Sequence, residues 1–181
     1  YVRCRSRGPM DLFLTIWSPR ALNDHAARMN VIFAVYYGAM LVMVIYNLFL
    51  FLSLRDRSFL YFVLYCLAFI TFQLCLNGLA FQHLWPDHPW WAKQSIPSWV
   101  ILSSIFAIQF VRYYLDTMHY VPVIDRVMKT VLLLYAVVIP VTFFADYSAT
   151  IITLIALTMI LAVFLYVVSI KVLMMGNRAA R

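Results

Sequence analysis

The sequence contains no glutamate and little charge of either sign. Its seven acidic residues are all aspartate, and charged residues make up 12% of the 181 positions, compared with about 25% in soluble domains. Hydrophobic residues reach 65%, compared with about 45–50% in soluble domains. These proportions exclude a soluble globular domain, a disordered tail and a collagen-like fibre. They predict a polytopic membrane protein.

Cysteine is too scarce for a disulfide framework. Two of the three cysteines, Cys66 and Cys75, lie nine residues apart in one apolar segment. At about 100° per residue they point to opposite sides of a helix. Cys4 lies in the hydrophilic N-terminal stretch, and no histidine or carboxylate stands at ligand spacing from any of the three. We therefore predict no metal site and no cofactor.

Groups that carry chemistry at membrane depth are also missing. The four histidines are dispersed, and the sequence offers no nucleophile–base pair and no glycine-rich phosphate loop. Each aspartate lies outside the apolar segments or at their edges, whereas transporters usually place ionisable groups or broken helices at the membrane centre. Pro140 is the only proline expected inside a helix, since Pro97 is placed in a first turn. The pattern predicts neither an enzyme nor an ion pathway within this chain.

Long apolar runs dominate the sequence from residue 31 onward. Each is near or above the ~20 residues that cross ~30 Å of hydrocarbon at 1.5 Å per residue, and connections this short favour antiparallel neighbours. The predicted membrane helices are residues 31–54, 59–84, 94–115, 127–145 and 149–173. The predicted fold class is an all-α polytopic membrane helix bundle.

The first thirty residues have a different character. Residues 1–18 contain two short stretches rich in β-branched and aromatic residues, separated by the turn signal Gly8-Pro9. A two-stranded pair alone is only marginally stable. We interpret residues 1–18 as the last strands of a β-sandwich domain and residues 19–30 as a linker. Because the chain starts at Tyr1 and ends in a loop-like stretch, we expect it to be a fragment of a longer protein.

The net charge of +7 indicates topology rather than nucleic-acid binding, because the basic residues stand at segment ends and not on one face. Short cytoplasmic loops carry an excess of Lys and Arg. One set of loops and ends holds eight of them and the opposite short loops hold only Lys93. The eight are Arg55, Arg57, Arg112, Arg126, Lys129, Lys171, Arg178 and Arg181. This count predicts an outside N-terminus and a cytoplasmic Arg181.

Three amides stand out inside the apolar segments. Asn47 lies in the first, and Gln73 and Asn77 lie four residues apart in the second, so the latter two share a helix face. Buried amides in membrane bundles bond across helices for about 0.6–2 kcal/mol each. We interpret all three as inter-helix contacts, with a role in signal relay as the alternative.

The loop between the second and third segments is rich in tryptophan. Trp85, Trp90 and Trp91 cluster at the predicted outer boundary, where amphipathic rings favour the interface. An anchoring belt is the main interpretation. Trp85, His88 and Trp90 are the alternative candidates for contacts with an outer ligand.

Several motifs resemble one bacterial family, the seven-transmembrane receptors with diverse intracellular signalling modules. The most specific part covers the first two helices and the loop between them. The motifs are Tyr36-Tyr37-Gly38-Ala39-Met40, Ile45-Tyr46-Asn47-Leu48-Phe49-Leu50-Phe51, Leu54-Arg55-Asp56-Arg57-Ser58-Phe59-Leu60-Tyr61, Asn77-Gly78 and Leu84-Trp85-Pro86. Residues 1–18 look like the closing strands of the family's periplasmic jelly-roll domain.

The resemblance implies a receptor region in a bacterial inner membrane, truncated before helices six and seven. It would relay a periplasmic signal, such as a carbohydrate-like ligand, to a cytoplasmic output domain: a diguanylate cyclase, a histidine kinase or a phosphatase. Homodimerisation fits such receptors, although no interface motif in this chain supports it. A subunit of a secondary transporter or channel, and a membrane enzyme whose active site lies beyond Arg181, remain the alternatives.

Overall fold

The structure is a computed structural model that describes residues 18–143 and 147–174. Every regular element in these residues is a helix, which confirms the all-α membrane bundle. The two strands predicted within residues 1–18 lie outside the described residues, apart from Ser18. The helices are α1 (Pro19–Leu54), α2 (Arg57–Leu76), α3 (Leu79–His83), α4 (Pro89–Tyr114), α5 (Thr117–Tyr120), α6 (Pro122–Thr142) and α7 (Tyr147–Met174).

Four of the described helices are long and apolar enough to cross a membrane: α1, α2, α4 and α7. Of these, α1 and α7 expose many large apolar side chains, as helices facing lipid do, whereas α2 and α4 lie more within the bundle. The fourth predicted span, 127–145, overlaps α6, which has 21 residues and begins five residues earlier. Asp125, Arg126 and Lys129 occupy its first two turns and shorten its apolar part.

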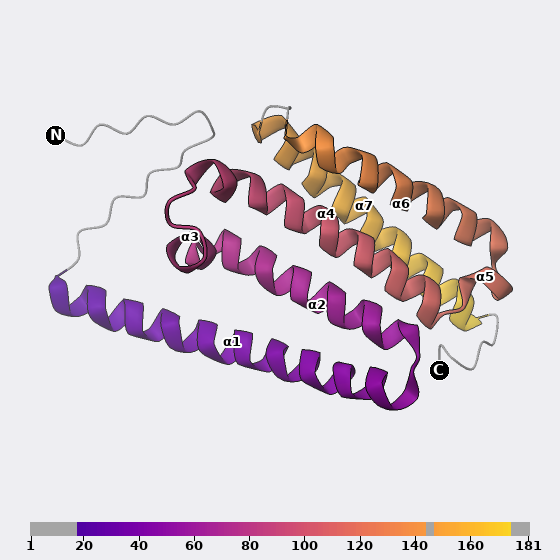
Figure 1. Cartoon of the computed structure of the whole chain (residues 1–181), viewed down its shortest axis with the longest axis horizontal. Helices are drawn as coiled ribbons and strands as arrows, with labels where there is room; N and C mark the ends of the chain where they lie inside the picture. The colour runs from indigo at the N-terminus through magenta and orange to yellow at the C-terminus, as the bar shows by residue number, and fades with distance from the viewer. Residues whose placement is uncertain (1–17, 144–146, 175–181) are drawn as a thin grey trace.

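The α4 helix occupies the centre of the bundle (Figure 1). It packs against α2 on one side and against α6 and α7 on the other, while α1 packs on α2 at the edge. The largest buried core joins the three helices α4, α6 and α7. Its members are Ile101, Ile108, Met128, Tyr135, Leu154 and Leu161. A smaller core of Val44, Val63 and Cys66 holds α1 on α2.

The long helices alternate in direction, so the bundle has two distinct ends (Figure 1). The α5 end contains the α1–α2 turn, the end of α4, α5, the start of α6 and the end of α7. The α3 end contains α3, the start of α4 and the connection from α6 to α7. The 36 residues of α1 correspond to about 54 Å, and its N-terminal part extends beyond α3.

Residues 19–30, predicted as a linker, form the first three turns of α1. Ser18 is the N-cap and accepts a hydrogen bond from the Ala21 N–H, while Pro19 stands at the start of the helix. Both residues favour helix initiation at this point. The helix therefore starts well before the apolar run that the sequence predicted as its span.

The second predicted helix, 59–84, is interrupted. Asn77 ends α2, and Gly78 has a φ of +74°, a left-handed conformation that residues with a side chain rarely adopt. The chain then turns into the short α3. The first-turn position predicted for Pro97 is also wrong, because α4 begins at Pro89 and places Pro97 in its interior.

Candidate functional site: a buried ionic cluster at the α5 end

Asp125 is the centre of a charged cluster between α4, α5 and α6. Its Oδ1 accepts a hydrogen bond from the Arg112 Nε at 2.8 Å and another from the Thr117 hydroxyl at 3.2 Å. Its Oδ2 pairs with the Lys129 Nζ at 3.0 Å, one turn further along α6. The Asp125 side chain is only 5% exposed. Two cations and a hydroxyl thus surround one buried carboxylate.

Local sequence explains how these groups meet. The α4 helix ends at Tyr114, and Asp116 reverses the chain with a φ of 46°, an uncommon left-handed conformation for a residue other than glycine. The short α5 that follows carries Thr117. Pro122 then starts α6 and places Asp125 in its first turn, where the helix dipole favours an anion.

The cluster keeps Asp125 in its charged form. Burial raises the pKa of Asp125, but hydrogen bonds from Arg112 and Lys129 outweigh this effect and hold the pKa below the ordinary carboxyl range. Gln109 accepts a further hydrogen bond from Arg112 Nη1 at 2.7 Å, so the guanidinium is fixed from two sides. Asp125 is therefore a charged clamp between α4 and α6.

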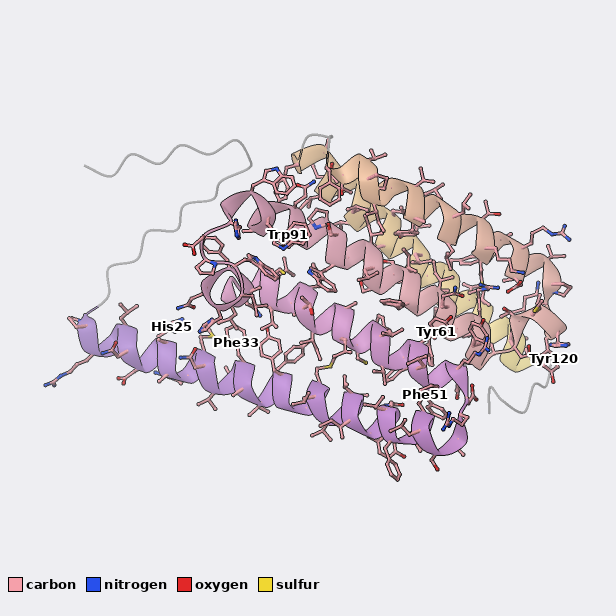
Figure 2. All side chains as sticks on the ribbon, in the orientation of Figure 1. His25, Phe33, Phe51, Tyr61, Trp91 and Tyr120 are labelled. Carbon is pink, nitrogen blue, oxygen red and sulfur yellow. The ribbon has the colours of Figure 1, made fainter. Side chains whose placement is uncertain are left out.

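A small cavity of about 100 Å³ adjoins the clamp. Its lining includes Arg112 and Asp125 together with Tyr113, Asp116 and Met118. Tyr113 stacks on Tyr61 of α2, with ring centroids 5.0 Å apart and planes at 15°. Figure 2 labels Tyr61 where α2 approaches the end of α4. The aromatic pair extends the contacts of the cluster from α4 to α2.

The chemistry available here is ionic and structural. The carboxylate of Asp125 is already occupied by three donors, so it is a poor general base in this packing. Across the described residues, no group of three or more His, Cys, Asp or Glu side chains could hold a metal ion. The arrangement holds helices together, and it can release them when its charges are disturbed.

The sequence pattern alone does not reveal this cluster. Asp125 lies before the predicted span 127–145, and Arg112, Arg126 and Lys129 contribute only to the count that predicts topology. The four-residue spacing of Asp125 and Lys129 was a usable signal for an ion pair on one helix face. The approach of Arg112 depends on the tight turn at Asp116, whose left-handed backbone conformation the sequence pattern does not predict.

The three predicted amides lie apart from the cluster and behave differently from one another. Asn77 Nδ2 donates to the Tyr37 hydroxyl of α1 at 2.9 Å, so it joins two helices. Asn47 Nδ2 donates to the Met43 carbonyl at 2.8 Å within its own helix. At Gln73 the recorded contact is of the backbone, whose carbonyl accepts the Asn77 N–H at the end of α2. The structure therefore places these residues on α1 and α2 without bringing them together as one site.

The predicted outer-loop residues lie at the α3 end, opposite the ionic cluster. Trp85 and Trp90 both contact Trp91, with ring centroids 6.4 Å apart in each pair. Trp90 and Trp91 also contact Phe143, which follows the last turn of α6. Figure 2 shows Trp91 at this end and Tyr120 at the other.

These aromatic contacts link the loop to α6. The Gln94 amide supports the same link by donating to the Thr142 carbonyl. His88 is an exposed residue at the start of α4, and Trp90 is 64% exposed. Part of this group of aromatic residues is thus exposed on the surface of the protein.

A family model described as 7TM diverse intracellular signalling matches residues 29–181, which is most of the chain. The chain belongs to this family. No curated protein and no solved structure gives a significant match. Membership confirms the family suggested by the sequence motifs, and it makes the chain a multi-pass membrane protein with a signalling role.

Proposed function

We propose that this region of the 7TM diverse intracellular signalling protein relays a periplasmic signal across a bacterial inner membrane to a cytoplasmic output. In this proposal the α3 end faces the periplasm and the α5 end faces the cytoplasm. The charge distribution supports this orientation. Four basic residues outside the ionic cluster lie at the same α5 end: Arg55, Arg57, Arg126 and Lys171.

The observation that carries the proposal is the Asp125 clamp. A relay needs an element with two packings whose balance a signal can shift. The clamp holds the start of α6 against the end of α4, at the end of the bundle proposed to meet the output. At the other end, Trp90, Trp91 and Phe143 connect the outer loop to the end of the same α6. The helix therefore has a contact site at each membrane face.

The nature of the signal and of the output is part of the same proposal. The signal would be a periplasmic ligand, for which a carbohydrate-like molecule remains the working hypothesis, and the output would lie in a cytoplasmic domain. We assign no reaction to residues 18–174, and any enzymatic activity would belong to that output domain. The cluster lies in the first turn of α6 and not at the membrane centre, which favours a relay over a transport pathway.

The relay is tested by measuring helix positions in the full-length protein. Spin labels would be placed at Ser53→Cys on α1 and Val123→Cys on α6, both exposed, in a background without native cysteines. Pulsed electron resonance in lipid nanodiscs then gives the distance distribution. We expect one population of distances in the labelled protein that is otherwise unaltered. Asp125→Asn should add a second population, because the clamp is weakened.

The matched control is Asp116→Asn, which changes an exposed carboxylate at the same end and should leave one population. If Asp125→Asn gives the same distribution as the unaltered clamp, the relay mechanism is wrong.

Orientation is tested separately in intact cells with a membrane-impermeant maleimide. Gln82→Cys in α3 should be labelled, and Met118→Cys in α5 should be labelled only after lysis. The reverse pattern would overturn the proposed orientation.

A further inference from the structure

The turn between α1 and α2 forms a groove that the relay does not use. The groove has a volume of about 460 Å³ and is lined by Phe51, Arg55, Arg57, Leu60 and Tyr61. Figure 2 labels Phe51 and Tyr61 at this end of the bundle. The groove combines two guanidinium groups with apolar and aromatic side chains.

The backbone of this turn is well defined by its own hydrogen bonds. Arg55 ends α1 in a left-handed conformation, and its N–H donates to the Phe51 carbonyl at 2.8 Å. Asp56 caps α2, and its Oδ1 accepts the Ser58 N–H at 2.9 Å. The only carboxylate in the turn is therefore engaged by the start of α2.

The two arginines of the groove keep their charge available. Within the described residues neither Arg55 nor Arg57 forms an ion pair, whereas Arg112 and Lys129 both pair with Asp125. Both groove arginines are exposed. A guanidinium presents a planar fork of donors that matches the oxygens of a phosphate group. The groove thus carries two positive charges that no carboxylate in the described part of the protein neutralises through an ion pair.

The position of the groove selects the kind of anion. It lies where two candidate membrane-spanning helices end, because α1 finishes at Leu54 and α2 begins at Arg57. Phe49 and Leu52, on the last turns of α1, are exposed apolar residues. Basic residues at such a boundary attract anionic lipid headgroups, and the apolar helix surface beside them suits acyl chains.

We propose that this groove binds an anionic phospholipid, with its phosphate held by Arg55 and Arg57 and its acyl chains lying along Phe51, Leu60 and the exposed surface of α1. The two arginines of this site take no part in the proposed relay, although Tyr61 also stacks on Tyr113 beside the Asp125 cluster.

The test uses native mass spectrometry of the full-length protein in detergent with added dioleoylphosphatidylglycerol or dioleoylphosphatidylcholine. The variant is Arg55→Asn with Arg57→Gln, since asparagine tolerates the left-handed conformation at position 55. Each arginine near a charged surface contributes about fivefold in binding. We therefore expect the double variant to lose phosphatidylglycerol binding by about 25-fold and to bind both lipids equally.

The matched control is Arg126→Gln with Lys171→Gln, which removes two exposed cations at the same end but outside the groove. It should retain binding to within about twofold, because those cations are not in the groove. Circular dichroism checks that each variant keeps its helix content. If the double variant unfolds, Arg57→Gln alone, which leaves the α1 cap intact, should still lose about fivefold.

Three results would overturn the proposal. Equal binding of the two lipids by the unaltered protein would show that charge does not direct binding. An equal loss in the control variant would indicate diffuse attraction to the whole α5 end. Competition by inorganic phosphate at the concentration of the lipid would identify a site for a soluble anion.

Discussion

Replacing Asp125 with asparagine should destabilise the folded bundle by about 2–3 kcal/mol. Removing one partner of a buried ion pair typically costs about 3–5 kcal/mol, because the other charge is left without compensation. Here Arg112 retains its bond to Gln109 and is 15% exposed, and Lys129 is half exposed. Asparagine also keeps a neutral acceptor for Thr117. These factors place the expected cost at the low end of that range or below it.

The assay is the free energy of unfolding of the full-length protein in mixed micelles, followed by circular dichroism as SDS is increased. Asp116→Asn is the control, since this carboxylate is 51% exposed and pairs with the exposed His119. Exposed pairs of this kind contribute little to stability. A double-mutant cycle with Arg112→Gln should give a coupling energy of at least about 1 kcal/mol, as contacting residues in one network do.

The pH dependence follows from the sign of the shift. The pKa of Asp125 is lower in the folded protein than its ordinary value of 3.8, so the folded state favours the charged form. Its contribution is fully present above the ordinary pKa and is lost as the pH falls through the folded pKa. The stability difference between the unaltered protein and Asp125→Asn should be constant from about pH 5 to pH 7 and should close below about pH 4.

Two results would refute this reasoning. A cost for Asp125→Asn no greater than that for Asp116→Asn would mean that the clamp contributes no more than a surface pair. A stability difference that stays the same at low pH would mean that the charge of Asp125 is not what stabilises the cluster.

Three further predictions concern other parts of the bundle. Gly78→Ala should lower the free energy of unfolding by about 1–2 kcal/mol in the same assay, because φ is +74° there. Gly38 lies in open space within α1, so Gly38→Ala should raise the free energy of unfolding by about 0.5–1 kcal/mol. Equal effects of the two substitutions would contradict the argument from backbone conformation. Tyr37→Phe removes the hydroxyl that joins α1 to the end of α2 and should cost about 0.6 kcal/mol, so a loss above about 2 kcal/mol would show a larger role. His119 donates a hydrogen bond to the carboxylate of Asp116, and this bond raises the pKa of His119. Asp116→Asn should lower that pKa in an NMR titration, and an unchanged pKa would disprove the pairing.

The apolar runs in the sequence were enough to predict an all-α membrane bundle, and four of the described helices are long and apolar enough to cross a membrane. In the hydrocarbon of a membrane, a run of about twenty residues has no water to pair with its backbone N–H and C=O groups. A helix pairs these groups within one segment. The family motifs around Arg55–Ser58 identified the family before the fold was known. Helix limits were less predictable, because polar residues 19–30 still extend α1 once Ser18 and Pro19 start it.

Only the tertiary structure decided which polar groups meet. Arg112 and Asp125 are thirteen residues apart, and their 2.8 Å contact exists because Asp116 reverses the chain and α4 packs against α6. Likewise, the sequence placed Trp90 and Trp91 at a membrane boundary, but their contact with Phe143 follows from the pairing of α4 with α6. Hydrophobicity depends on each segment alone, whereas a buried charge finds its partner only through the packing of separate helices.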